Sequence, residues 1–199
     1  MVQRTPRSRP TPALGLSALL CALFGAVAPG CGDDDGSTGT GAGGGACASE
    51  LGADGCFDAA CFTVPAEPVS FRGAVLPILE TSCSLSGSCH GNPSSPETAA
   101  GYQPYLGEVN PETTPSDVAL ILATIVGQPS RAATNLAIVA PGDPAASFLL
   151  HKMDGSLDCA SLTCDGGCGD LMPLGSDEPL DRATRDTIRA WIAQRAEDN

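Results

Sequence analysis

Two cysteines and a histidine form the most distinctive chemical pattern of the sequence. Cys83 and Cys89 are separated by five residues, and His90 follows directly. Two such thiols can form thioether bonds to the vinyl groups of a haem, and the adjacent imidazole can bind the iron. The usual attachment motif has two residues between its cysteines. The wider spacing by itself favours a Cys83–Cys89 disulfide followed by a surface histidine, although a longer loop can bulge between two attachment points.

A second group of cysteines offers a different chemistry. Cys159, Cys164 and Cys168 lie in a Gly-rich loop, and with His90 or His151 they could form a zinc site with three thiolates and one imidazole. The loose spacing and an oxidising compartment favour disulfides instead. The sequence contains no Gly-x-Ser-x-Gly motif and no phosphate-binding loop, so we do not expect an enzyme, although a haem enzyme stays a lower-ranked alternative.

The overall composition limits the class of protein further. The chain has 199 residues and a formal net charge of −13, which excludes a basic surface for nucleic acid. It contains 24 Gly and 17 Pro residues, a composition that predicts short elements joined by many turns. Ten cysteines in a chain of this length indicate an oxidising compartment outside the cytosol.

The beginning of the chain has the features of an export signal followed by a tether. Three arginines precede an apolar stretch that is too short and too weakly apolar for a comfortable membrane span. Small residues then lead to Cys31, as in a bacterial lipobox, so residues 1–30 are predicted to be a lipoprotein signal peptide and Cys31 to carry the lipid. An ordinary secretion signal, with Cys31 free or disulfide-bonded, is the alternative. Residues 31–46 are Gly-rich and are predicted to form a disordered tether.

The elements that must position these groups are predicted to be mainly α-helical. Residues 47–70 have little periodicity, so we expect an irregular Cys-rich segment held by disulfides within itself or to the 159–168 loop. Apolar spacing, capping residues and Gly or Pro stops predict four short helices joined by long loops. These helices cover about 71–83, 117–126, 144–153 and 180–196. In the last helix Ile188, Trp191 and Ile192 share one face, which places the only Trp in the core.

Three strings in a fixed order resemble one protein family. The first is FRGAVLPILETSCSLSGSCHG, the second is VAPGDPAASFLL from Val139, and the third is Leu171-Met-Pro followed by Leu180 and the helix with Trp191-Ile192. Together they resemble class I cytochrome c domains of the planctomycete cytochrome type. The resemblance covers about residues 70–199 and implies a small cytochrome c-like helical domain at 71–199.

The resemblance implies a haem c site made of four residues. Thioether bonds would form at Cys83 and Cys89, His90 would be the proximal iron ligand and Met172 the distal one. A Met between a flexible loop and a helix is suited to that role, and thioether ligation raises the reduction potential. His151 and Met153 are the alternative distal ligands. The simpler expectation is that Met153 fills the core and that His151 lies on the surface.

Two functions follow from these patterns. The first is a mono-haem c electron-transfer protein, lipid-anchored to the bacterial cell envelope (periplasm or outer membrane), whose acidic surface favours a basic redox partner. The alternative is a haem-free, disulfide-stabilised envelope lipoprotein with a binding or structural role. Cysteine counting does not separate them, because the eight cysteines after Cys31 allow four disulfides, or three disulfides with Cys83 and Cys89 reserved for haem.

Overall fold

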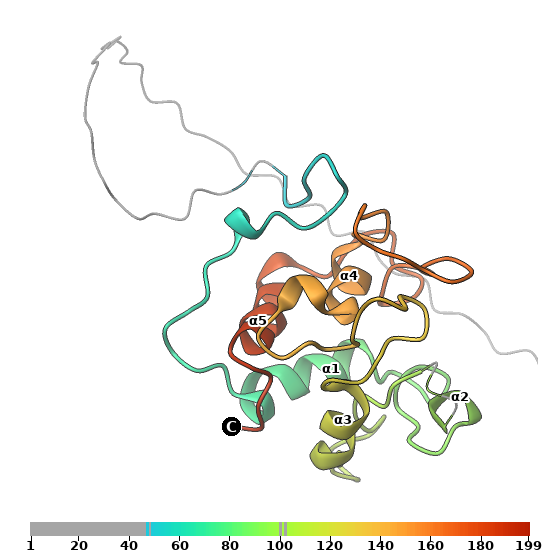
Figure 1. Cartoon of the computed structure of the whole chain (residues 1–199). Coiled ribbons are helices and arrows are strands. Elements are labelled where there is room, and N and C mark those ends of the chain that lie inside the picture. The colour runs from blue at the N-terminus through green and yellow to red at the C-terminus, as the bar shows by residue number, and fades with distance from the viewer. Residues whose placement is uncertain (1–46, 48, 100, 102) are drawn as a thin grey trace, which may run out of the picture. The chain divides into compact units, whose positions relative to one another are not determined.

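The structure, a computed structural model, describes residues 47, 49–99, 101 and 103–199 (Figure 1). The signal peptide, the tether and the lipid site at Cys31 lie outside these residues. The described residues belong to one compact unit. They contain helices, isolated β-bridges and three disulfides, and no β-strand is formed among them. None of the helices in this part of the chain has the length and apolar character to cross a bilayer.

The predicted helix before Cys83 is present as two consecutive pieces. A π-helical turn, η2 (Phe71–Val75), continues into α1 (Leu76–Ser82). The Ser70 hydroxyl caps the start by accepting a hydrogen bond from the Gly73 N–H. Pro77 stands in the first turn of α1, a position where the missing N–H of proline is tolerated. The helix ends at Ser82, and Cys83 is its C-terminal cap. The cysteine–histidine pattern therefore begins directly at the end of this helix.

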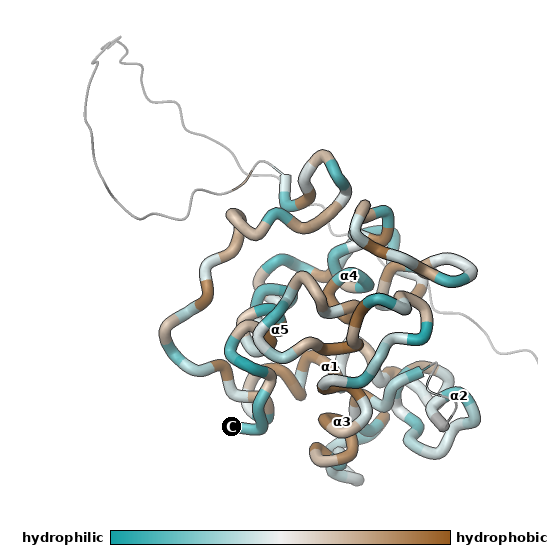
Figure 2. Tube along the Cα trace, viewed as in Figure 1, coloured by the Kyte–Doolittle hydropathy of each residue, from teal (hydrophilic) through white to brown (hydrophobic). Residues whose placement is uncertain are grey.

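The next segment is mostly loop, as predicted, but it contains one short helix that the prediction lacked. This helix, α2 (Pro96–Ala99), has Pro at its first position, and the Ser95 hydroxyl accepts a hydrogen bond from the Thr98 N–H. The predicted helix after it is α3 (Val118–Ile125), which begins where the Asp117 carboxylate accepts from the Leu120 N–H. Hydrophobic residues dominate α3 (Figure 2).

The expected single helix over 144–153 is wrong in detail. A 3₁₀ turn, η3 (Pro144–Ala146), is separated from α4 (Phe148–Asp154) by Ser147, whose backbone is extended. The Ser147 hydroxyl donates to the Asp143 carbonyl and accepts from the Ala140 N–H, so local polar contacts compete with helix continuation. α4 then ends at Gly155, which adopts a left-handed conformation.

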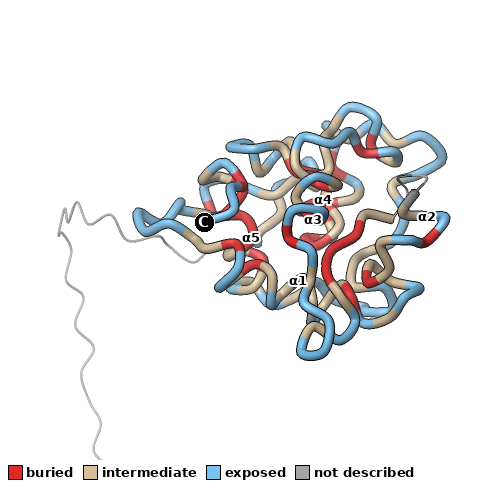
Figure 3. The backbone as a smooth tube through the Cα atoms, turned by 90° about the horizontal axis from the view of Figure 1, so that it is seen from below, coloured by how far each residue is buried: buried red, intermediate tan, exposed pale blue. Residues whose placement is uncertain are grey.

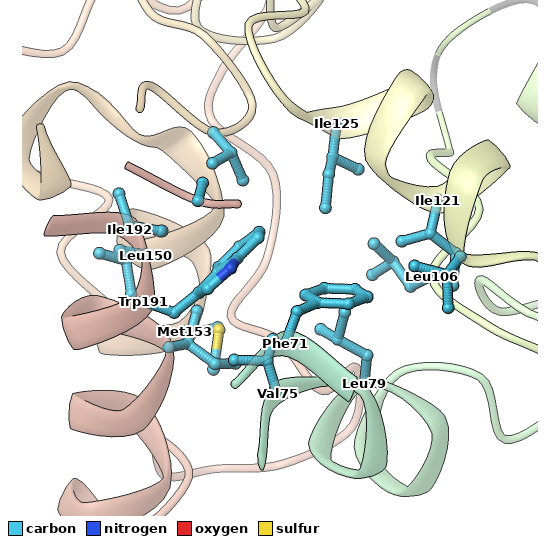
Figure 4. Close-up of a cluster of buried hydrophobic side chains, with 14 of the residues drawn as sticks. Phe71, Val75, Leu79, Leu106, Ile121, Ile125, Leu150, Met153, Trp191 and Ile192 are labelled. Carbon is cyan, nitrogen blue, oxygen red and sulfur yellow. The ribbon is translucent and has the colours of Figure 1, made fainter. Parts of the chain in front are cut away.

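The last helix, α5 (Arg182–Ala193), organises the hydrophobic core. It packs against η2 and α4. Ile188, Trp191 and Ile192 are buried on its inner face, as the spacing predicted. The Trp191 ring lies 5.1 Å from the Phe71 ring, centroid to centroid, among the other core side chains (Figure 4). Buried positions concentrate inside the unit, and the surrounding loops are mostly exposed (Figure 3).

The Cys-rich segment is held by disulfides in both of the ways predicted. Cys47 is bonded to Cys61, at the end of the short 3₁₀ helix η1 (Ala59–Cys61), and Cys56 is bonded to Cys159. The third disulfide, Cys164–Cys168, closes a small loop. Because this segment has few apolar side chains to bury, covalent links contribute a large share of its ordering.

Charged contacts add to these links. Asp154, at the end of α4, accepts hydrogen bonds at 2.6–2.7 Å from Arg185 and Arg189 of α5. Arg185 also donates to Glu50 at 2.6 Å, and the Arg189 guanidinium stacks 3.6 Å from the centre of the Phe57 ring. These five residues and the Cys56–Cys159 disulfide form what we call the pinned region.

Candidate functional site

One cavity gathers the four residues of the predicted haem site. It has a volume of about 350 Å³ and is mainly apolar. This volume lies within the range of small-molecule and cofactor sites, which is roughly 300–1,000 Å³. Its walls come from the end of α1, the loops near 104 and 131, α4 and the 167–174 loop, and they include Cys83, Cys89, His90 and Met172. Segments distant in sequence therefore meet at one site.

Cys83 and Cys89 are the two cysteines of the described chain that form no disulfide. Burial raises the pKa of Cys83 to about 12, and the neighbouring Cys89 acts in the same direction. The Cys83 thiol is therefore neutral at physiological pH. The Cys89 sulfur accepts a hydrogen bond from the Ser86 hydroxyl at 3.2 Å. The local disulfide that the spacing favoured is absent between these two residues.

The loop between the two thiols turns outward. Leu85 is 62 % exposed although its side chain lines the cavity, which places it at the rim. The loop is closed by the His90 N–H, which donates to the Cys83 carbonyl at 3.1 Å. Gly91 is required directly after it, because a Cβ there would lie 2.5 Å from the Val109 side chain and 3.0 Å from the Ser84 carbonyl. The loop thus brings Cys83, Cys89 and His90 to the same cavity.

His90 is held in an orientation suitable for a metal ligand. Its Nδ1 lies 2.8 Å from the Pro104 carbonyl oxygen, so the tautomer with the proton on Nδ1 donates this hydrogen bond. The lone pair of Nε2 is then available for a ligand. Burial lowers the pKa of His90, and the positive charge of Lys152 acts in the same direction, against the hydrogen bond to Pro104. The imidazole is therefore favoured in the neutral form that binds metals.

Met172 reaches the cavity on a loop that is attached to α4. The Met172 N–H donates to the Lys152 carbonyl at 2.9 Å, and the Lys152 ammonium donates to the Cys168 carbonyl at 3.1 Å. The Cys164–Cys168 disulfide restrains the same loop. Beyond Met172, Leu174 is 70 % exposed and lines the cavity, so it forms a second part of the rim.

The two alternative distal ligands occupy different surroundings. His151 is not a surface residue as expected but is buried, and it does not line the cavity. Its Nδ1 lies 2.9 Å from the Ser156 hydroxyl and its Nε2 lies 3.1 Å from the Ala145 carbonyl, so both ring nitrogens have partners. Met153 borders the cavity but belongs to the hydrophobic core, where it is 1 % exposed, in agreement with its predicted role as core filler.

The zinc alternative is wrong. Cys159 is bonded to Cys56, and Cys164 to Cys168, so none of the three thiols is available to a metal. Among the described residues, no group of three or more His, Cys, Asp or Glu side chains is placed to hold a metal ion.

Several residues of the site were not found from the sequence. Pro104 has no signal of its own, because its role depends on a carbonyl brought to His90 by the fold. Lys152 could have been singled out from the sequence, because it is the only lysine in an acidic chain. Arg131 lines the cavity from the long connection between α3 and η3, where its position could be known only from the tertiary structure.

Comparisons with protein-family models, with curated proteins and with solved structures find no match to this chain. The function is therefore inferred from the site itself and from the resemblance of the three sequence strings.

Proposed function

We propose that this chain is a mono-haem c electron-transfer protein whose haem occupies the cavity. The observation that carries the proposal is the convergence of Cys83, Cys89, His90 and Met172 on one mainly apolar cavity. The resemblance of the three sequence strings implies the same four residues as thioether sites and axial ligands. The finer fold assignment, a cytochrome c-like helical domain over 71–199, is part of the same proposal and is supported by the resemblance of the three strings.

The side chains that line the cavity include the chemical groups that bind a haem c. Cys83 and Cys89 keep their thiols while the six other described cysteines are bonded in pairs. His90 offers a neutral imidazole with Nε2 available, and Met172 offers a thioether. When bound, haem c supplies one-electron redox chemistry, with a potential raised by Met ligation. The protein's contribution would be to hold these groups and to exclude water with apolar walls, beside a rim where Leu85 and Leu174 are exposed.

The cellular setting is proposed on composition and disulfides. Three disulfides are typical of an oxidising compartment. We propose export and lipid anchoring to the bacterial envelope through Cys31, in the periplasm or the outer membrane. The net charge of −13 favours a basic redox partner and an association that weakens as salt concentration rises.

The decisive experiment is expression of the full chain together with the machinery for haem c maturation. We expect a pyridine haemochrome spectrum of haem c, with thioether links at Cys83 and Cys89 that thiol reagents do not open. A colourless protein with a reducible Cys83–Cys89 bridge would overturn the proposal. The haem-free, disulfide-stabilised envelope lipoprotein with a binding or structural role would then take its place.

Matched variants test the individual roles. His90→Gln should remove the low-spin spectrum, whereas His151→Gln, which changes the only other histidine, should retain it. Met172→Leu should lower the reduction potential, because the Met172 sulfur no longer binds the iron. The haem should stay attached, because the covalent links at Cys83 and Cys89 are unchanged. Met153→Leu is its control and should leave the potential unchanged. If the Met153 variant shifts the potential and the Met172 variant does not, the assignment of the distal ligand is wrong.

A further inference from the structure

We infer that Lys152 and Arg131 form an ionic subsite of this cavity that binds the carboxylate groups of the bound porphyrin. The inference rests on the proposed function, because it assigns the porphyrin's two propionates to residues of this chain. It concerns how the ligand is oriented and retained, and it is separate from the thioether and iron contacts.

The charge of the cavity wall is opposite to that of the chain. The sequence contains 23 acidic and 10 basic residues. Yet Arg131 and Lys152 line the cavity, and the described wall includes no Asp or Glu. An apolar cavity whose fixed charges are both positive favours an apolar ligand that carries negative groups.

Lys152 supports the inference more strongly than Arg131, because burying an ammonium without a carboxylate beside it costs free energy. The side chain is half-buried, and among the described residues no carboxylate lies within ion-pair distance of its ammonium. Asp170 acts on it only at longer range. One N–H donates to the Cys168 carbonyl, and an ammonium has two more donors to offer. A ligand carboxylate would satisfy both the charge and the donors.

The two buried arginines of α5 show that buried cations elsewhere in the described chain are paired with carboxylates. Arg185 and Arg189 are both buried, and each is paired with the Asp154 carboxylate. Lys152 lies on α4 two residues before Asp154, yet it faces the cavity instead of an acid. The contrast indicates that a ligand of the cavity, and not one of the described residues, supplies the carboxylate for Lys152.

Arg131 supplies a second and different cation. It is exposed, whereas Lys152 is half-buried, and both line the same cavity. A guanidinium binds carboxylates through a planar fork, and an ammonium binds them as a compact point charge. Two cations match two carboxylates in number.

The test uses the full chain with Cys83→Ala and Cys89→Ala, so that porphyrin binding is reversible. The probes are metal-free protoporphyrin IX and its dimethyl ester, which have the same ring and differ in charge, and the measurement is fluorescence titration. We expect the free acid to bind at least tenfold more tightly than the ester. Lys152→Gln and Arg131→Gln should each weaken binding of the acid about tenfold and leave binding of the ester unchanged.

The controls separate charge from folding. Lys152→Arg keeps the cation and should retain the preference for the acid, and Arg72→Gln removes an exposed cation that does not line the cavity and should change nothing. Equal binding of acid and ester overturns the inference while leaving the proposed function intact, if the matured wild-type chain shows a haem c spectrum. Failure to bind either probe also overturns it, and that spectrum then decides separately whether the proposed function stands.

Discussion

The pinned region and the cavity both contain cysteines and buried or half-buried cations, but they differ in whether these groups have disulfide or carboxylate partners among the described residues. In the pinned region the cysteines are bonded, and the buried arginines are paired with Asp154 and Glu50. At the cavity two thiols are unbonded, a half-buried ammonium has no carboxylate within ion-pair distance among the described residues, and two leucines are exposed at the rim. In the pinned region the thiols are bonded and the buried charges are paired within the chain. At the cavity the thiols of Cys83 and Cys89 and the Lys152 ammonium remain available to a ligand. That difference is expected between a part that stabilises the fold and a part that binds a ligand.

The largest expected effect is loss of the long-range disulfide. Cys56→Ala with Cys159→Ala should lower the free energy of unfolding by about 5 kcal/mol in the chain-entropy model, because the bond closes a sequence separation of 103 residues. Denaturant unfolding without reductant measures it. As a control, Cys164→Ala with Cys168→Ala opens a separation of only 4 residues beside the cavity and should cost about 2 kcal/mol in the same model. Equal losses would contradict the contrast between the two regions.

The second effect concerns the charge at the centre of the pinned region. Asp154→Ala should cost about 3 kcal/mol in urea unfolding, the lower end for a broken buried ion pair, because it removes the carboxylate that Arg185 and Arg189 share and leaves each with one other acid, Glu50 or Asp186. Asp198→Ala removes an exposed ion pair with Arg72 and serves as the control, with little expected change. A small loss for the Asp154 variant would show that water or another acid replaces the carboxylate.

A smaller effect, dependent on pH, tests the core residue Tyr105, which lies between two residues of the cavity wall, Pro104 and Leu106. Burial raises the pKa of Tyr105 to about 12 from an ordinary value of 10, and its hydrogen bond to Glu108 acts in the same direction. The folded state then holds the proton more tightly than the unfolded state, so stability falls as pH rises from about 10 to 12. The measurement is urea unfolding across this range in a chain lacking Cys83 and Cys89.

Tyr105→Phe is the matched control for this pH dependence. It removes the titrating hydroxyl, so the part of the loss that it abolishes belongs to Tyr105. An unchanged slope between the two chains would contradict the raised pKa.

The smallest effect is expected at the rim. Leu174→Ser should change the free energy of unfolding by less than about 0.5 kcal/mol, because the side chain is 70 % exposed and fills no core. Thermal or urea unfolding of the haem-free chain checks this. A loss comparable to that of the Asp154 variant would mean that the rim supports the fold and is not reserved for contact with a ligand or partner.

Local signals in the sequence were enough for most of the secondary structure. Asp117 caps α3 at the start of the predicted helix, and the spacing of Ile188, Trp191 and Ile192 predicted the buried face of the last helix. Such features depend on neighbouring residues and short periods, which a linear pattern contains. The interruption at Ser147 was missed because the extended backbone there is fixed partly by hydrogen bonds to other residues of the turn.

The sequence by itself determined which residue types were available for chemistry: a cysteine pair beside a histidine, one Met in a Gly-rich loop and an excess of acidic residues. Only the tertiary structure decided which cysteines pair, because a disulfide needs two sulfurs brought together by segments far apart in the chain. It likewise placed Met172 and Lys152 at the cavity of His90. That placement depends on long-range packing of α4 against the 167–174 loop, and no local spacing specifies this contact.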